Sequence, residues 1–160
     1  MFNPDLPGPP TYMPSIETAA RSLKVGPITV PVHSDAEIET AIIALGREPG
    51  GGLLMTGGFS FSHSAHIISA AARNNVPAVY AISAVVRDGG LLSYGRYQSS
   101  FDSMRGAATY VDRILRGEKP GDLPVQLPTK FEMILNLKTA KALGLAIPPS
   151  IRLRADEVIQ

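Results

Sequence analysis

A short apolar run that lies between glycines and leads into a helical pattern constrains this chain more than any other feature. The run Leu53–Thr56 is preceded by Gly50–Gly52 and followed by Gly57–Gly58. Apolar runs of this length between glycines are typical of buried strands. Beyond a polar and aromatic stretch, apolar side chains recur at helical spacing, at Ile67, Ile68, Ala71 and Ala72. Because ligands in open α/β sheets bind where such strands end, the sequence predicts a site at Gly57–His63.

The rest of the chain repeats this alternation of strands and helices. Buried strands are predicted over Val76–Ile82, Leu91–Gly95 and Phe131–Leu135. A further strand, near a sheet edge, is predicted over Val25–Val32, because two prolines that cannot donate to a ladder interrupt its β-branched run. Strands that alternate with helices predict an α/β fold: a mostly parallel sheet in a three-layer, α-β-α, Rossmann-like arrangement.

Capping residues and apolar spacing predict two helices in the first third of the chain. The first runs from Ser15 to about Lys24, after a proline-rich loop over residues 1–14. The second begins at a capping box, in which Ser34 and Glu37 each satisfy a free backbone N–H group.

The later helices follow from the same signals. A long helix is predicted from Ser99 or Ser100 to Gly117, a short one capped by Asn136 or Thr139 and ending at Gly144, and a last helical turn after Pro148. The long helix is expected to face inward with its apolar side chains, which are Met104, Ala107, Ala108, Val111, Ile114 and Leu115.

Composition restricts the classes of protein to which the chain can belong. Its 160 residues and 44% hydrophobic content fit one globular domain with its own core. A net charge of +1 predicts no nucleic-acid partner and no anionic membrane surface. The absence of cysteine excludes disulfides and thiolate zinc sites. No apolar run approaches the roughly 20 residues of a membrane span, and the N-terminus shows no signal-peptide pattern.

Two histidines near the predicted site raise the question of a metal. His63 and His66 lie three residues apart at the start of a predicted helix, where both imidazoles could face one way. A zinc ion needs three or four ligands, and neither a cysteine nor a nearby glutamate completes the set. We therefore interpret them as solvated histidines and expect neither a metal nor another cofactor.

Serines beside these histidines suggest a nucleophile, as in a small α/β serine hydrolase using Ser60 or Ser62 with His63 or His66. The nucleophile elbow of such enzymes places a glycine two residues after the serine. Another serine occupies that place in both cases. We therefore expect no catalytic residue and no enzymatic activity, and keep the hydrolase as an alternative.

Four segments resemble one family of transport proteins. They resemble the C-terminal part of ABC-transporter substrate-binding proteins of the tryptophan/tyrosine-type family, and they are Gly89–Gly95, Ala107–Pro120, Asp122–Val125 and Pro128–Ile159. Phe2–Asp5 and Glu17–Leu23 are similar to the opening of that family's second lobe. The resemblance covers nearly the whole chain.

The resemblance implies a type I periplasmic binding fold, in which two α/β lobes joined by a hinge close on a small-molecule solute. The chain would be the C-terminal lobe only, with a signal peptide and a first lobe before Met1. It would divide into the second lobe (1–98), a hinge-crossing helix with its connector (99–124), and a returning strand with C-terminal helices (125–160). The full-length bacterial protein would be periplasmic and would deliver its solute to an ABC permease of the inner membrane.

The same resemblance implies where the solute binds. In this family the turn after the third strand of the lobe often carries an acidic residue that reaches a ligand ammonium. Here the turn Thr56–Phe61 has no acid, which favours an aromatic or other weakly charged solute. Aromatic faces would stack on the solute and hydroxyl groups would orient its polar edge. The residues expected on this cleft wall are Thr56, Phe59, Ser60, Phe61, Ser83 and Tyr94.

The resemblance also bears on the long helix near residues 99–117. That helix would pack on the missing lobe, so its apolar face is expected to be unprotected in this chain. Exposed apolar stripes of that length tend to bind a partner, and we expect a homodimer or exchanged segments. A second alternative function is the ligand-sensing domain of a transcription regulator, which would need a DNA-binding headpiece upstream.

Overall fold

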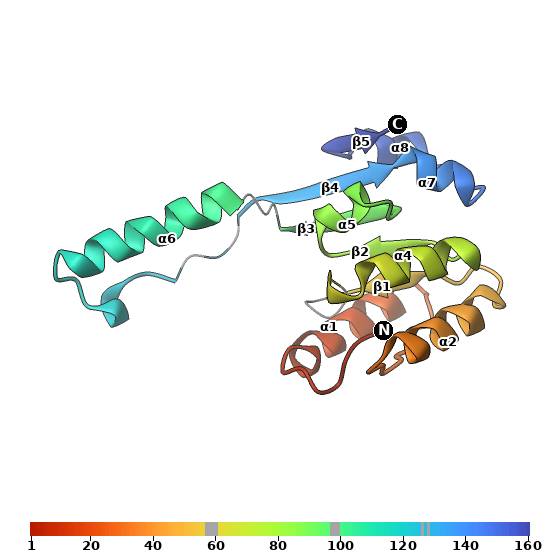
Figure 1. Ribbon diagram of the computed structural model, residues 1–160, viewed down its shortest axis with the longest axis horizontal. Coiled ribbons are helices and arrows are strands. Elements are labelled where there is room, and N and C mark those ends of the chain that lie inside the picture. Colours follow the sequence, from red (N-terminus) through yellow and green to blue (C-terminus); the bar gives the residue numbers. More distant parts are fainter. Residues whose placement is uncertain (57–60, 97–99, 126, 128) are drawn as a thin grey trace.

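The computed structural model describes residues 1–56, 61–96, 100–125, 127 and 129–160, with the backbone alone at 100–103 and 105. In this part of the chain a five-stranded sheet is flanked by helices, and one long helix, α6 (Ser100–Leu115), extends away from the sheet (Figure 1). The predicted α/β fold is confirmed. No described helix combines the length and the apolar character that a bilayer crossing requires.

The strands follow one another across the sheet in the order of the sequence. They are β1 (Leu53–Met55), β2 (Ala78–Tyr80), β3 (Leu92–Arg96), β4 (Phe131–Asn136) and β5 (Glu157–Ile159). The first three are parallel to one another, β4 is antiparallel to β3, and β5 is parallel to β4. The predicted strands at β1 to β4 are confirmed, and β5 was not predicted.

Helices connect and cover these strands. Besides α6 they are α1 (Pro9–Ser22), α2 (Asp35–Gly46), α4 (Ser64–Arg73), α5 (Ser83–Arg87), α7 (Leu137–Ala142) and α8 (Pro149–Arg152), with a 3-10 turn η1 (Pro120–Asp122).

The predicted caps act close to the way the sequence indicates. The Ser34 hydroxyl accepts a hydrogen bond from the Glu37 backbone N–H at 3.4 Å. The Glu37 carboxylate accepts from the backbone N–H of His33, rather than of Ser34, at 2.8 Å. This bond, together with one to the His33 ring, lowers the pKa of the Glu37 carboxyl. At α7 the Asn136 side chain accepts from the Thr139 N–H at 3.1 Å.

The prediction that residues 1–14 form a loop is wrong for their second half. Helix α1 begins at Pro9 and continues through Pro14. Pro9 and Pro10 are tolerated because they lie in the first turn, where the N–H groups have no partner within the helix, whereas Pro14 lies inside the helix. Further along, the Thr18 hydroxyl donates to the carbonyl of Pro14 at 2.8 Å.

The predicted strand over Val25–Val32 is also wrong. The segment forms only an isolated parallel bridge, in which Phe2 pairs with Pro31. The Phe2 N–H donates to the Val30 carbonyl at 3.2 Å, and the Val32 N–H donates to the Phe2 carbonyl at 2.9 Å. Pro27 and Pro31 have no N–H to extend a ladder, and no strand lies beside the rest of this segment among the described residues.

One face of the sheet carries the core. Along β1 and β2 the alternate side chains Leu53, Met55, Ala78 and Tyr80 are buried, and the parallel register places them on one face. Burying an aliphatic side chain contributes about 1.5–3 kcal/mol, so this face dominates the stability of the sheet. Helices α2, α4 and α5 contribute to the same cluster with Ile38, Ile42, Ile67, Val85 and Val86.

The inward orientation predicted for the long helix is wrong for this chain. Helix α6 extends beyond the sheet, from the end of β3 toward a connector that returns to β4 (Figure 1). It ends near Gly117, which has a φ of 101°. Because α6 lies outside the core, its large apolar side chains are exposed, namely Met104, Val111, Ile114 and Leu115.

We expect Gly95→Ala to destabilise the sheet. A β-carbon at Gly95 would collide with the backbone carbonyl oxygen of Ala81, which no rotamer change can move away. Overpacking of this kind lowers the free energy of unfolding by about 1–3 kcal/mol. Urea titration measures the loss. The control is Gly106→Ala in α6, where a β-carbon meets nothing within 4 Å. Equal stabilities for the two variants would contradict the close approach of β3 to Ala81.

The buried Tyr80 predicts a loss of stability at high pH. Burial raises the pKa of its phenol to about 12, whereas an exposed tyrosine titrates near 10. Between these two pH values the unfolded chain loses the proton and the folded chain keeps it. The free energy of unfolding should therefore fall as the pH rises through this range, by up to about 3 kcal/mol.

Urea titrations at about pH 9 and about pH 11.5 test this point when the protein is compared with Tyr80→Phe, which lacks the titrating hydroxyl. The variant should lose less stability than the parent protein over this interval. Identical losses would show that Tyr80 is not shielded from water.

Candidate functional site

The candidate site lies at one end of the sheet, which we name the carboxyl rim. At this end β1, β2 and β3 have their last residues and the antiparallel β4 begins. Thr56 follows β1, and Ser83 follows β2 as the first residue of α5. Parallel strands bring these segments to the same end although they are far apart in the sequence.

Among the described residues, two exposed aromatic rings lie side by side at the rim. Tyr94 and Phe131 stack with their ring centroids 6.1 Å apart and their planes 21° apart. They are 57% and 51% exposed. The register pairs Arg96 with Phe131 and Tyr94 with Met133, so both rings project from the same face of adjacent strands. A solvent-facing aromatic platform of this kind can receive a flat, apolar group.

Tyr94 was predicted from the sequence, and Phe131 was not. Phe131 was visible as the first residue of a predicted strand. What the sequence did not show is that this strand runs antiparallel beside Tyr94.

Thr56 lies on the same face as Tyr94. Side chains alternate between the two faces along a strand, so Thr56 lies on the same face as Leu54 and on the face opposite the buried Met55. Leu54 is in register with Val79. The Thr56 hydroxyl donates to the Tyr12 phenol oxygen at 3.0 Å. Tyr12 was missed because its segment was predicted to be a loop, whereas it lies in α1 and brings a second hydroxyl to the end of β1.

Phe61 lies just before α4 and is 54% exposed. It therefore offers a second aromatic surface after the end of β1. Phe59 and Ser60 lie outside the described residues.

The structure does not bring the Ser83 hydroxyl together with the Tyr94 ring. Ser83 is only 8% exposed. Helix α5 packs on the opposite face of the sheet, where the Asn136 side-chain amide donates to the Val86 carbonyl at 3.3 Å. Asn136 follows Leu135, which pairs with Leu92, so it lies on the buried face of the sheet.

A buried acid at the rim was not predicted. Glu132, the second residue of β4, is 8% exposed and lies opposite Gly95. Within the described part of the chain its carboxylate makes no hydrogen bond or ion pair. A carboxylate at this place can contact a cationic group supplied from outside these residues. The signal in the sequence was one acid within an otherwise apolar strand.

The two histidines join α4 to α2. His63 Nδ1 lies 2.6 Å from Asp35 Oδ1. His66 Nε2 lies 3.2 Å from Glu39 Oε2, in a geometry that makes no hydrogen bond. The same glutamate accepts two bonds of 2.9 Å from Arg73. These contacts tie two helices together, and among the described residues no cluster of three metal-ligating side chains is found.

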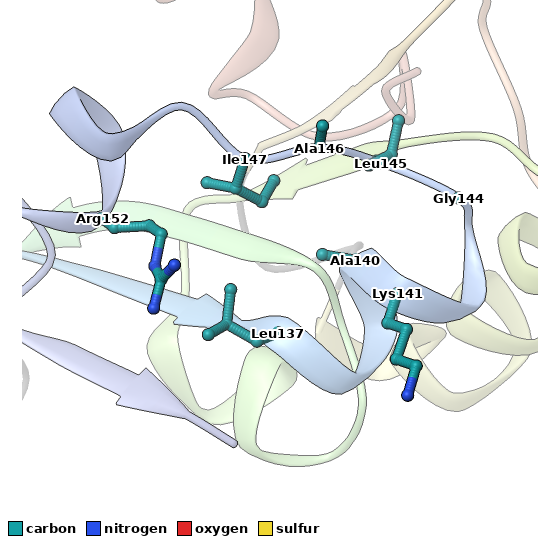
Figure 2. Close-up of a pocket in the computed structure, with 8 residues that line it drawn as sticks. All are labelled: Leu137, Ala140, Lys141, Gly144, Leu145, Ala146, Ile147 and Arg152. Atoms are coloured by element: carbon teal, nitrogen blue, oxygen red, sulfur yellow. The ribbon is translucent and has the colours of Figure 1, made fainter.

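A hollow lies at the opposite end of the sheet, where β4 ends and α7 begins (Figure 2). It has a volume of about 430 Å³ and combines apolar walls with the cations Lys141 and Arg152. None of the predicted site residues lines it. Its lining residues are Leu137, Ala140, Lys141, Gly144, Leu145, Ala146, Ile147 and Arg152.

Comparison with known proteins supports the family suggested by the sequence. The family model of the ABC transporter substrate binding protein matches residues 14–159. No curated protein matches the chain.

Solved structures share the fold. A conserved domain protein from Vibrio cholerae is 23% identical, with a TM-score of 0.85, over 98% of this chain and 52% of its own. The ABC domain in complex with L-Trp from Streptococcus pneumoniae is 22% identical, with a TM-score of 0.84, over 99% and 53%. A ligand-free, open substrate binding protein with adhesive properties from Clostridium difficile is 20% identical, with a TM-score of 0.68, over 100% and 53%.

The chain thus spans about half the length of the solved structures that it matches. These likenesses establish the fold. The family follows from the match over residues 14–159: the chain belongs to the ABC transporter substrate-binding proteins.

Proposed function

We propose that the carboxyl rim is one wall of a solute-binding cleft, and that the protein is the non-catalytic solute-binding component of an ABC import system. The observation that carries this proposal is the exposed, stacked pair Tyr94 and Phe131 at the rim of a chain from this family. The opposite wall would come from a first lobe. Two lobes that close on a solute share its contacts, so neither lobe alone binds it well.

The division of the chain supports this arrangement. We propose that residues 1–98 form the second lobe, 99–124 the hinge-crossing helix and its connector, and 125–160 the returning strand and C-terminal helices. In support, β3 and β4 pair side by side, and the chain between them leaves the sheet and returns (Figure 1). The exposed apolar face of α6 fits a helix that packs on another lobe.

The rim favours a small solute with a flat apolar part. Tyr94, Phe131 and Phe61 present aromatic surface, and Thr56 with Tyr12 presents hydroxyl groups. A structural neighbour in complex with L-Trp is consistent with a solute of this class. Stacking on rings and a few directed polar contacts are the usual means of binding such molecules.

The place of action and the permease are further parts of the proposal. A solute-binding protein of an importer works outside the cytoplasm and hands its solute to a permease in the inner membrane. The hydrolase alternative is less well supported, because the turn lacks the glycine that a nucleophile elbow needs. Nothing in the described structure favours a regulator.

We expect an affinity for aromatic solutes that depends on both lobes and on Tyr94. In the two-lobed protein, Tyr94→Ala should weaken the binding of L-tryptophan or a related aromatic solute about tenfold, because a stacked ring is lost. Tyr94→Phe is the matched control and should bind like the parent protein. Titration calorimetry measures both.

The 160-residue chain alone should show no binding in the same titration, since it supplies one wall only. Micromolar binding to the lone chain, or full affinity of Tyr94→Ala, would contradict the proposed cleft.

We also expect the isolated chain to self-associate through α6, as a homodimer or by exchange of segments. The stripe Met104, Val111, Ile114 and Leu115 is exposed, and burying it in a second copy removes apolar surface from water. Light scattering coupled to size exclusion should show a dimer at high concentration. Val111→Glu should weaken the self-association at least about tenfold, because the new charge would be buried without a partner in the dimer.

Lys119 lies beyond the stripe, so Lys119→Glu serves as the control for a change of charge. A clean monomer at high concentration, or equal effects of the two substitutions, would contradict association through α6.

A further inference from the structure

The hollow between α7 and α8 lies in a stretch of the chain whose charges are all of one sign. Residues 137–155 contain four cations and no acid, whereas the whole chain has a net charge of only +1. All four are exposed, and none forms an ion pair or a side-chain hydrogen bond with another described residue. Elsewhere, arginines such as Arg21, Arg73 and Arg87 hold a carboxylate. The four cations are Lys138, Lys141, Arg152 and Arg154.

The walls of the hollow are aliphatic. Ala140 is 2% exposed, and Leu137, Leu145 and Ile147 are half-buried around it. Figure 2 shows Leu137 and Ile147 on opposite sides of the hollow, with Ala140 between them. The described residues that line the hollow include no aromatic ring. The hollow therefore differs in kind from the carboxyl rim, where exposed rings dominate the apolar surface.

Arg152 brings a positive charge to one side of these walls. It comes from α8, whereas the aliphatic residues come from α7 and the segment that follows it. Figure 2 shows its guanidinium group directed toward Leu137, while the ammonium group of Lys141 points away from the hollow. Arg152 is therefore the cation that borders the apolar space.

The segment after α7 adds backbone donors. The positive φ of Gly144, 65°, turns the chain after the helix, and the Leu145 N–H then donates to the Ala140 carbonyl at 2.9 Å. The next two N–H groups, those of Ala146 and Ile147, donate no hydrogen bond within the described structure, although both residues line the hollow. N–H groups and a guanidinium group donate and cannot accept, so they favour a ligand group that only accepts.

We propose that the hollow is a second ligand site, and that it takes a small amphipathic anion, a carboxylate joined to a short aliphatic chain. Arg152 would hold the carboxylate, because a guanidinium group binds a carboxylate through two parallel hydrogen bonds. One monoanionic group matches the single cation that borders the walls. The aliphatic chain would lie between Leu137, Ala140 and Ile147. This inference is independent of the proposed solute cleft, which lies at the other end of the sheet.

The size of the hollow limits the ligand. Its volume of about 430 Å³ lies within the range of small-molecule sites. A water molecule takes up about 30 Å³ of liquid, so the hollow has room for on the order of ten to fifteen non-hydrogen atoms. Octanoate, with about ten such atoms, fits this room. A linear aliphatic chain also suits walls without rings better than a flat aromatic group does.

The test is a titration of the isotope-labelled 160-residue chain with octanoate, followed through amide chemical shifts. Octanoate should shift the amide signals of Ala140, Ala146 and Ile147, and the shifts should saturate. Octan-1-ol has the chain without the charge, and acetate has the charge without the chain. Each should bind at least about tenfold more weakly than octanoate, because one of the two contacts is missing. Raised salt should also weaken octanoate binding.

Two arginine variants separate the site from its surroundings. Arg152→Gln should weaken octanoate binding about five- to tenfold, because a charge-assisted pair is lost. Arg154→Gln is the matched control, since it removes the same charge from a residue outside the lining, and it should bind within about twofold of the parent protein. Both side chains are exposed and unpaired among the described residues, so thermal unfolding should show the same fold for both variants.

Three results would overturn the inference. Shifts confined to the signals of Tyr94 and Phe131 would place octanoate at the carboxyl rim. Equal weakening by Arg152→Gln and Arg154→Gln would show a general positive surface rather than a site. Binding to phosphatidylglycerol vesicles or to an acidic peptide, with no response to octanoate, would assign the basic stretch to a membrane or a protein partner.

Discussion

The parallel pairing of β1, β2 and β3 is the constraint on which the rest of this structure depends. Parallel strands terminate at the same end of the sheet, so residues separated by up to forty positions meet there. The antiparallel β4 then adds Phe131 to that end beside Tyr94. The parallel register also places the buried alternate side chains of β1 and β2 on one face of the sheet, where the core lies.

Two exposed apolar features of the chain fit the proposed two-lobed protein. They are the aromatic rings at the rim and the stripe on α6. The chain spans about half the length of the structures it resembles. In the proposed arrangement a first lobe covers both. The sheet face packed against α2, α4 and α5 carries the buried core of the described chain.

Local signals predicted the elements whose partners are close in the sequence. The glycine-bounded run at β1, the cap at Ser34 and the cap at Asn136 each depend on a few neighbouring residues. The failures depend on distant ones. The segment 25–32 has strand composition but pairs only at Pro31 with Phe2, and α6 has an amphipathic pattern but nothing described to pack on. For the proposed site, Tyr94 could be predicted from its strand end, whereas Phe131 and Glu132 required knowledge of the β3–β4 register.

The central claim is that a solute lies against the carboxyl rim between two lobes. The most direct measurement is a crystal structure of the two-lobed protein with an aromatic solute bound. The ring of the solute should lie within about 4 Å of Tyr94 or Phe131, with Thr56 or Tyr12 directed at its polar edge. A solute bound elsewhere, for example in the hollow beside Arg152 at the opposite end of the sheet, would contradict the claim.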